Sequence, residues 1–377
     1  MMNKTDLFRN AYGLAGRLAR KGYMRWWHSF RGTNRETGDT RTFFIEYFLM
    51  NPALGGDVPI WGLHPYYRKR HMRPSYFLIK AGVLPSGQGE KGCQLHRYFG
   101  IHELQRTPQP FTLQAEECFC GEQLISGSIE VSDQEARQRF LQTDAGSMDW
   151  NLEVHKTISC HTGFMASPLF TALNALDSFW HGEGIQCYYR GQVALNGQVY
   201  HVSTEDCYGY ADKHWGRAYN SPWLQFASNH LYSQRTGKDL KHSALAIDGC
   251  HSKFLCFPLG RKLNLQLTYT GEDIDFTSAG ILKFPRIAWD SGEKKGHLVW
   301  HIKAKNRDMV LKLSISSRLR TMMPMNYETT DGRRYRKPIL CGNQGQGWVE
   351  IYRRTPGGLQ LLDKLTIRDA LCEYQDK

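Results

Sequence analysis

Apolar and polar residues alternate along much of this chain, and the alternation predicts β-strands. The segments LNLQLTY (263–269) and MVLKLSIS (309–316) carry an apolar side chain at every second position. A period of two is typical of a strand that has one buried and one solvated face. The segments TFFIEYFLM (42–50) and SYFLIKAGVL (75–84) are more continuously apolar and are rich in residue types that favour strands.

Turn signals separate these strands. Asn196-Gly197 stands between GQVAL and QVYHV, and this dipeptide is the strongest short-range signal for a β-hairpin, because both turn residues must accept a positive φ. Further turns are predicted at Thr270-Gly271, Asp248-Gly249 and Asp331-Gly332. Many short strands joined by glycine-containing turns indicate an all-β protein of antiparallel barrels or sandwiches, not a parallel α/β sheet.

An amphipathic helix is predicted near the N-terminus, in KTDLFRNAYGLAGRLARKG (4–22). Its apolar face consists of Leu7, Ala11, Leu14, Ala15 and Leu18, and the surrounding basic residues are Arg9, Arg17, Arg20 and Lys21. Such a helix either plugs or flanks the main fold, or lies on an anionic membrane surface. Both alternatives stay open at this level.

A second short helix is predicted in SPLFTALNALDSFWHGEG (167–184). Ser167 is a suitable N-cap and Pro168 suits the first helical position. The apolar residues at helical spacing are Leu169, Ala172, Leu173, Leu176 and Trp180. A short helix between two strand-rich halves indicates a domain junction near residue 180, so we expect one β-domain over 1–180 and a second over 181–377.

Length and charge narrow the protein class. The 377 residues suit one large domain or two smaller ones. The net charge of +12 favours an acidic partner, such as nucleic acid, an anionic membrane or a phosphorylated ligand. None of the 10 cysteines forms a C-x-x-C pair, and neither a signal peptide nor a membrane-spanning apolar run is expected. We expect a soluble, cytoplasmic protein with free thiols.

Motifs for metals and cofactors are missing. IHELQR (101–106) has Arg106 where H-E-x-x-H needs its second histidine, and GNQGQGW (342–348) is neither a P-loop nor a dinucleotide-binding loop. We therefore predict no metal and no cofactor. The basic clusters RKRHMR (68–73) and RRYRK (333–337) are either solvated loops or an anion or membrane patch. No nucleic-acid-binding module accompanies them, so no nucleic-acid partner is predicted.

The stretch YGYADKHWGRAYNSPWLQFASNHL (208–231) concentrates aromatic and ionisable residues. Asp212-Lys213-His214-Trp215-Gly216, followed by Tyr219, Pro222 and Trp223, resembles the signature of the tocopherol cyclase family: an acidic residue, then Asn-Trp-Gly, a Phe or Tyr, a Pro and a tryptophan-rich strand. The segments 22–30 (GYMRWWHSF) and 42–52 (TFFIEYFLMNP) are also similar to that family. The chain departs from the pattern in having His214 in place of the asparagine and Trp26-Trp27-His28 in the first strand.

This resemblance implies a tandem of lipocalin-like β-barrels that act without a metal or organic cofactor. The broad architecture is shared by carotenoid hydratases and some natural-product cyclases. Their common chemistry is proton transfer to an alkene of a long, apolar, polyunsaturated substrate, followed by ring closure or water addition. A lipophilic small molecule is thus the expected partner.

Asp212 is the expected proton donor. Burial among aromatic side chains raises the pKa of a carboxyl group and keeps it neutral near pH 7, which alkene protonation requires. Tyr210 and His214 are the expected catalytic partners, His214 as an orienting group or proton relay. Aromatic faces would stabilise a substrate carbocation. The expected substrate-binding residues are Trp215, Trp223, Tyr208, Tyr219, Glu46 and Trp27.

Two of these assignments have structural alternatives. The pattern Tyr-x-Asp-x-x-Trp-Gly is also compatible with a tight corner between strands, in which Asp212 caps backbone N–H groups and the tryptophans are core residues. Glu46 interrupts an apolar run, so it either faces solvent at a sheet edge or lies in a cavity.

The leading functional hypothesis is a cofactor-independent cyclase or isomerase/hydratase that acts on a lipophilic isoprenoid or polyene substrate by proton transfer. The alternative is a non-catalytic lipid or isoprenoid carrier, for which a basic face and an N-terminal helix would suit membrane contact. The weakest hypothesis is a basic module that recruits an acidic partner.

Overall fold

Antiparallel β-strands make up most of the fold, as the alternating pattern predicts. The computed structural model describes residues 13–87, 89–160, 178–218, 223–254, 257–276, 286–333 and 338–375. The α-helices found there are short: α2 (Gly16–Arg20), α3 (Pro65–Lys69) and α4 (Asp133–Ala136). Among the described residues, no helix has the length and apolar character that crossing a bilayer requires.

A first sheet of 12 strands takes up the described residues from 23 to 216. In chain order these are β1 (Tyr23–Thr33), β2 (Thr40–Met50), β3 (Tyr76–Val83), β4 (Cys93–Phe99), β5 (Gln105–Pro108), β6 (Phe111–Ala115), β7 (Cys118–Gly121), β8 (Leu124–Val131), β9 (Gly146–Cys160), β10 (Ser178–Leu195), β11 (Gln198–Val202) and β12 (Gly209–Gly216). The hydrogen-bonded order is β4-β3-β2-β1-β11-β10-β9-β8-β7-β6-β5, with β12 paired to both β1 and β10.

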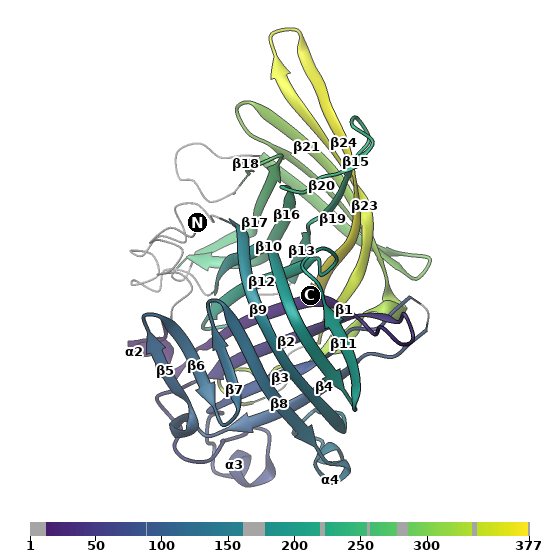
Figure 1. The fold of residues 1–377 in the computed structure, drawn as a ribbon. Helices are drawn as coiled ribbons and strands as arrows, with labels where there is room; N and C mark the ends of the chain where they lie inside the picture. The colour runs from purple at the N-terminus through teal and green to yellow at the C-terminus, as the bar shows by residue number, and fades with distance from the viewer. Residues whose placement is uncertain are drawn as a thin grey trace.

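This first sheet closes into a barrel, the lower body in Figure 1. The sheet curls until β4 packs against β8 and β9. Backbone bonds reinforce the closure, since Asp144 N donates to Gln94 O over 2.9 Å. A short 3₁₀ turn (Ile101–Glu103) follows β4.

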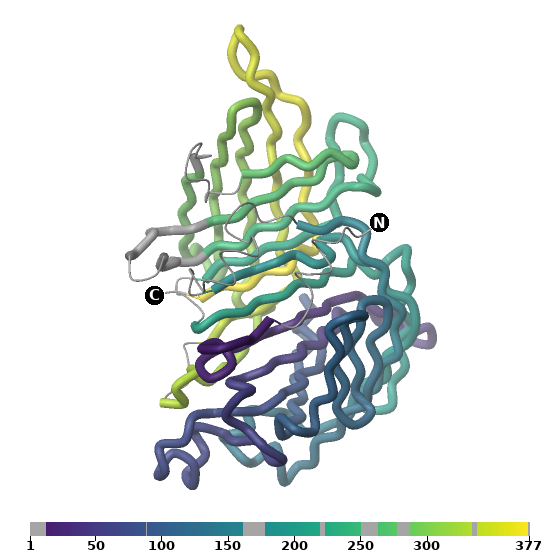
Figure 2. The backbone as a smooth tube through the Cα atoms, turned by 90° about the vertical axis from the view of Figure 1, so that its left-hand side faces the viewer, coloured from purple at the N-terminus to yellow at the C-terminus, as the bar shows by residue number. Residues whose placement is uncertain are grey.

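A second sheet, also of 12 strands in the described part of the chain, forms the upper body. Its strands are β13 (Trp223–Ser228), β14 (His230–Ser233), β15 (Lys238–Asp239), β16 (Ala244–Phe254), β17 (Phe257–Tyr269), β18 (Glu272–Asp275), β19 (Arg286–Lys294), β20 (His297–Lys305), β21 (Met309–Arg318), β22 (Met323–Met325), β23 (Ile339–Thr355) and β24 (Gly358–Gln375), with a 3₁₀ turn at Leu319–Thr321. The order runs from β18 through β17, β16, β13, β24, β23, β21 and β20 to β19. Its two end strands, β18 and β19, do not pair with each other in the described residues, so this sheet is a half-barrel stacked on the first (Figure 2).

The turn predictions are partly confirmed. Asn196 and Gly197 join β10 to β11 with φ angles of 49° and 81°, as a two-residue hairpin requires. Thr270 and Gly271 likewise join β17 to β18 with positive φ. The turn expected at Asp248-Gly249 is wrong, because both residues lie within β16.

The helix predicted over 167–184 lies partly outside the described residues, which resume at 178. Its last part is wrong, because residues 178–184 belong to strand β10. Residue 180, where we expected a domain junction, therefore stands inside the first sheet. The change from the first sheet to the second falls between Gly216 and Trp223.

Three hydrophobic clusters hold the fold together. One fills the first barrel, one fills the concave side of the second sheet, and one lies where the two sheets meet. Leu14 and Leu18 pack into the first cluster, so the described part of the N-terminal helix flanks the barrel. Membrane contact by that segment stays a prediction.

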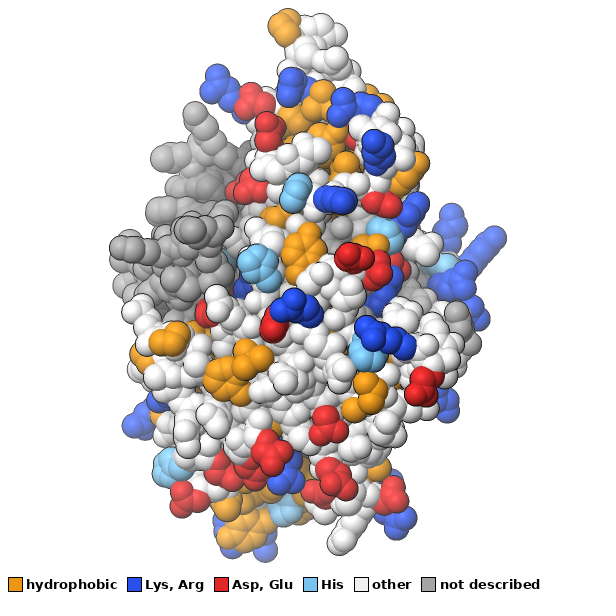
Figure 3. Space-filling model, in the orientation of Figure 1, with side chains coloured by type: hydrophobic (Ala, Val, Ile, Leu, Met, Phe, Trp, Pro, Cys, Tyr) orange, Lys and Arg blue, Asp and Glu red, His pale blue; other side chains and the backbone are white. Residues whose placement is uncertain are grey.

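The surface carries charges of both signs. On the face shown in Figure 3, Lys and Arg side chains are interspersed with Asp and Glu. The basic cluster 68–73 is exposed around the end of α3. Eight cysteines are free thiols: Cys93, Cys118, Cys120, Cys160, Cys187, Cys207, Cys341 and Cys372.

Candidate active site between the two sheets

Strand β12 carries the central motif, and its residues alternate between two buried surroundings. Tyr210, Asp212 and His214 face the second sheet, whereas Lys213 and Trp215 face the interior of the first barrel. Successive side chains of a strand point to opposite faces. Both faces of β12 are covered, so all eight of its residues are buried. The corner alternative for Asp212 is wrong, because Asp212 lies in the middle of a strand.

Strand register brings Glu46, Trp27 and Asp212 into one row across β2, β1 and β12. Trp27 is paired with Glu46 on one side and with Asp212 on the other. Directly paired residues of antiparallel strands project from the same face of the sheet. In the next row, Arg25 is paired with His214.

Asp212 is the centre of a hydrogen-bonded cluster. Its Oδ2 accepts bonds from Trp180 Nε1 at 2.9 Å and from Tyr210 Oη at 2.8 Å, and also from Gln225 Nε2. His214 Nε2 lies 3.3 Å from the same oxygen. The other oxygen, Oδ1, is buried and has no hydrogen-bond partner in the described part of the chain.

These contacts reverse the expected ionisation of Asp212. Burial on its own would raise the pKa of the carboxyl group. His214, the guanidinium of Arg25 and the bond from Trp180 outweigh burial and hold the pKa of Asp212 well below its usual range. The expectation of a neutral carboxylic acid is therefore wrong, and Asp212 is a carboxylate.

His214 completes the cluster. Its Nε2 is 3.2 Å from Gln225 Oε1, and its ring centroid is 4.6 Å from that of Trp223. Nδ1 is buried without a hydrogen-bond partner among the described residues. A protonated His214 would give the Asp212–His214 pair no net charge, which lowers the cost of burying both groups.

Tyr210 connects the cluster to a pocket. Its hydroxyl accepts from Gln225 Nε2 at 2.6 Å while it donates to Asp212. Burial and the nearby Asp212 carboxylate raise the pKa of Tyr210 well above its usual value, so the phenol is neutral.

A second ionic network lies beside the cluster and joins the two sheets. Arg25 Nε donates to Glu46 Oε2 at 2.8 Å, and Arg25 Nη2 lies 2.5 Å from Oε1 of Glu373 on β24. Lys80 Nζ is 3.4 Å from Glu46 Oε1, and Tyr327 Oη donates to Glu46 Oε2 at 2.6 Å. Glu46 is thus neither at a solvated edge nor in a cavity, but paired inside the interface.

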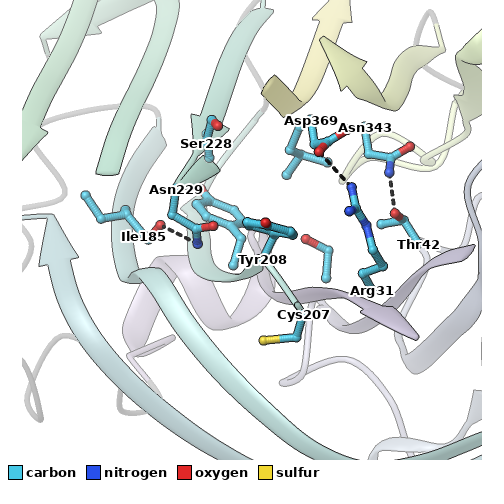
Figure 4. Close-up of a pocket in the computed structure, with 13 residues that line it drawn as sticks. Arg31, Thr42, Ile185, Cys207, Tyr208, Ser228, Asn229, Asn343 and Asp369 are labelled. Atoms are coloured by element: carbon cyan, nitrogen blue, oxygen red, sulfur yellow. Dashed lines mark hydrogen bonds and ion pairs between the residues drawn. The ribbon is translucent and has the colours of Figure 1, made fainter. Parts of the chain in front are cut away.

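Two hollows lie at the junction of the sheets. The inner pocket holds about 20 Å³, room for one water molecule, and Tyr210, Ile185, Ala227 and Leu371 help to line it. Figure 4 shows this pocket, with Tyr208 between Asn229 on one side and Arg31 and Asp369 on the other. A cleft of about 810 Å³ lies next to it, and Tyr208 and Asn229 line both hollows. Tyr210 lines the inner pocket, whereas Asp212 and His214 line neither of these two hollows.

The structure brings some predicted residues together and separates others. Trp223 contacts His214, and its Nε1 donates to Glu373 Oε2 at 3.1 Å. Trp215 lies on the opposite face of β12, stacked on Phe179. Tyr208 stands at the cleft, away from the Asp212 row. Tyr219 lies outside the described residues.

Sequence reasoning missed several members of the site. Trp180 binds Asp212 from the neighbouring strand β10, and Gln225 binds it from β13 of the second sheet, but nothing in their local sequence marks them. Arg25 did have a signal, because it interrupts the aromatic run YMRWW as Glu46 interrupts FFIEYF. Such a buried charge calls for a partner of opposite sign. No cluster of three or more potential ligands for a metal ion occurs in the described part of the chain.

No protein-family model and no curated protein matches the sequence. Solved structures with a similar fold include a Nitrosomonas europaea protein named as an AttH candidate, with 10% identity, a TM-score of 0.43 and 92% coverage of both chains. Kievitone hydratase from Nectria haematococca is similar with 11% identity and a TM-score of 0.42, over 97% of this chain and 95% of the hydratase. At such low identities and scores, we draw no functional conclusion from either likeness.

Proposed function

We propose that this protein is a cofactor-independent enzyme that transfers protons on a lipophilic small molecule, as an isomerase, hydratase or cyclase. The observation that carries the proposal is the chain Tyr210–Asp212–His214, which is buried between the sheets and ends at the wall of a pocket. The resemblance of residues 208–223 to the tocopherol cyclase motif supports a reaction of this class, and it rests on analogy.

The geometry supports transfer of a proton in both directions. Tyr210 lines the inner pocket, which has room for one water molecule, and its Oη already donates to Asp212 Oδ2. A ligand in the adjoining cleft therefore reaches Tyr210 only where its reacting carbon enters this small pocket. When Tyr210 takes a proton from the ligand, its own proton passes to the Asp212 carboxylate. A protonated His214, which shares the same Asp212 oxygen, can return a proton along the chain. Removal and return of a proton at different carbons isomerise a double bond.

The protonation states restrict the substrate. An isolated alkene needs a strong neutral acid, but Asp212 is ionised and the pKa of Tyr210 is raised. The chain therefore suits a double bond activated by conjugation, for example with a carbonyl group, whose neighbouring C–H bonds are acidic. An isoprenoid or polyene substrate fits when it carries such a group. The apolar side chains that line the two hollows suit an apolar molecule: Ile185, Ala227 and Leu371 at the inner pocket, and Leu231 and Leu240 at the cleft.

Native mass spectrometry of protein purified without detergent, followed by organic extraction, would identify a bound ligand. That ligand, or a panel of conjugated prenyl and polyene ketones, is then incubated with wild type and Asp212→Asn, and products are measured by chromatography. Asp212→Asn should bind the ligand and lose at least about a hundredfold in rate. Asp206→Asn, at an exposed position just before the motif, is the matched control and should keep its rate.

A carrier gives a different result. Ligand that stays bound and chemically unchanged in wild type and in both variants would support the carrier alternative and contradict the enzyme. Equal turnover by wild type and Asp212→Asn would show that the chemistry lies elsewhere.

A further inference from the structure

A histidine–carboxylate pair lies at the cleft, apart from the Asp212 cluster. His230 Nδ1 on β14 is 2.8 Å from Oδ2 of Asp369 on β24. Arg31 Nη2, from β1 of the first sheet, lies 2.8 Å from the same Asp369 oxygen (Figure 4). One carboxylate thus orients a histidine of its own sheet and binds a cation of the other sheet.

The backbone is distorted where this pair is built. Asp369 has a φ of 48°, and it lies where the pairing of β24 with β23 shifts register between Gly345 and Gly347. Bulges of this kind redirect a side chain and are common next to active sites. Tyr208, which lines both hollows, has a φ of 40°, a conformation unusual for a bulky residue. Strain of this kind is concentrated at functional sites.

Tyr208 also fixes the histidine ring. The two rings stack with centroids 4.1 Å apart and planes at 14°. The guanidinium carbon of Arg31 lies 4.9 Å from the Tyr208 ring centroid. The imidazole is therefore held by a carboxylate along its edge and by a phenol across its face.

The hydrogen bond decides which nitrogen can act. Asp369 Oδ2 accepts the hydrogen bond that His230 Nδ1 donates, so Nδ1 carries the proton and Nε2 of a neutral His230 keeps its lone pair. Arg31 already balances the charge of Asp369, so the pair needs no proton on Nε2 for neutrality. His230 lines the 810 Å³ cleft, and Nε2 has no hydrogen bond in the described part of the chain.

We propose that His230 is a second acid–base residue, which activates a water molecule in the cleft for addition to the ligand's double bond. The inference rests on the proposed function and narrows it to hydration. His230 Nε2 takes one proton of the water, and the water oxygen bonds to the β-carbon of the conjugated double bond. The electron pair of that bond moves toward the carbonyl, and the α-carbon takes its proton from Tyr210. Tyr210 regains a proton from solvent through the Asp212–His214 pair, and His230 gives its proton to solvent, so that the net change is the addition of one water molecule.

Labelling with two isotopes distinguishes the role of His230 in water addition from the role of Tyr210 and Asp212 in proton transfer to carbon. The ligand is incubated with protein in water labelled with oxygen-18 and, separately, in heavy water. His230→Gln should reduce oxygen-18 uptake by at least about a hundredfold and keep deuterium exchange at the acidic C–H next to the conjugated double bond, because Tyr210 and Asp212 remove and return that proton without the added water. Asp212→Asn should lose both signals. His102→Gln is the matched control: Nδ1 of this histidine also lies 2.9 Å from a carboxylate oxygen, Asp57 Oδ1, but the pair is exposed and lines neither hollow, so both signals should persist.

The outcomes are distinguishable. Undiminished oxygen-18 uptake by His230→Gln would overturn the inference, and so would a wild type that exchanges deuterium without taking up oxygen-18. A wild type that shows neither signal with any ligand it binds would overturn the proposed function, and with it this inference.

Asp369 acts through His230, so it is a positioning residue with its own test. Nitrogen-15 NMR of the histidine rings reports which ring nitrogen carries the proton. Wild type should show the Nδ1–H tautomer for His230, and Asp369→Asn should lose that preference while the other histidine signals stay in place. An unchanged His230 spectrum in Asp369→Asn would contradict the positioning role.

Discussion

Replacing Glu373 by Gln should weaken the fold strongly, because it leaves Arg25 under-paired in the interface. Arg25, Glu46 and Glu373 are each no more than 1% exposed. Arg25 pairs with both Glu46 and Glu373, and Lys80, whose pKa is lowered by burial, lies beside Glu46. Glu373→Gln keeps the shape of the side chain but removes one of the two carboxylates that pair with the buried guanidinium of Arg25.

The magnitude follows from the separation and the surroundings. Two unit charges about 4 Å apart interact by about 4 kcal/mol at an effective dielectric constant of about 20. Removing one partner of a buried pair costs about 3–5 kcal/mol in general. Gln retains one acceptor for Arg25 or Trp223, so we expect the free energy of unfolding to fall by about 3 kcal/mol. Urea unfolding followed by tryptophan fluorescence measures this change.

A surface pair provides the control. Arg190 and Glu153 also form a charged pair, with Nη2 and Oε2 2.7 Å apart, but their side chains are 69% and 64% exposed. Exposed pairs contribute less than about 1 kcal/mol. Glu153→Gln should therefore have little effect. Equal losses in Glu373→Gln and Glu153→Gln would refute the view that the buried network holds the two sheets together.

Two further predictions concern stability. Burial raises the pKa of Glu328 from its ordinary 4.5 to about 7, although the hydrogen bonds that the carboxylate accepts from Leu63 N and Gly62 N act to lower it. A folded-state pKa above the unfolded value contributes stability below pH 4.5, and this stability is lost as pH rises through 7. The free energy of unfolding of wild type should therefore fall by about 3 kcal/mol across that window relative to Glu328→Gln, measured by urea unfolding at each pH. A difference between the two proteins that stays constant with pH would contradict this. In Gly209→Ala the new Cβ would lie 2.3 Å from Cys187 O and 2.4 Å from Tyr189 Cδ2, so thermal denaturation should show a loss of about 2 kcal/mol. Gly292→Ala, which meets open space, should stay within about 0.5 kcal/mol of wild type, and similar losses in both would remove the steric explanation.

The fold was largely predictable, because it follows from local patterns. Period-two alternation in LNLQLTY and MVLKLSIS corresponds to β17 and β21, and Asn196-Gly197 forms the hairpin between β10 and β11. The helix expected over 167–184 failed at residues 178–184, where apolar side chains at helical spacing also suit a strand that is buried on both faces. Periodicity alone cannot separate a buried helix from such a strand.

The site was only half predictable, because its chemistry depends on partners far away in sequence. The motif identified Asp212, His214 and Tyr210 as a group, and strand alternation places them on one face of β12. The charge of Asp212 was mispredicted, because besides His214 it depends on Arg25 and Trp180, which tertiary structure alone brings close. Asp369 lies 139 residues from His230, and the bulge of β24 that carries it has no signal in the local sequence.

The ionisation of Asp212 tests the account most directly, and it needs no substrate. Carbon-13 NMR of protein labelled at the aspartate carboxyl groups gives the charge of each one, with Asp212→Asn to assign the signal. Because the pKa of Asp212 is held below its usual range, its signal should keep the ionised position from pH 7 down to about pH 4. An Asp212 signal that titrates above about pH 5 would identify a neutral carboxylic acid and contradict the proton-transfer chain.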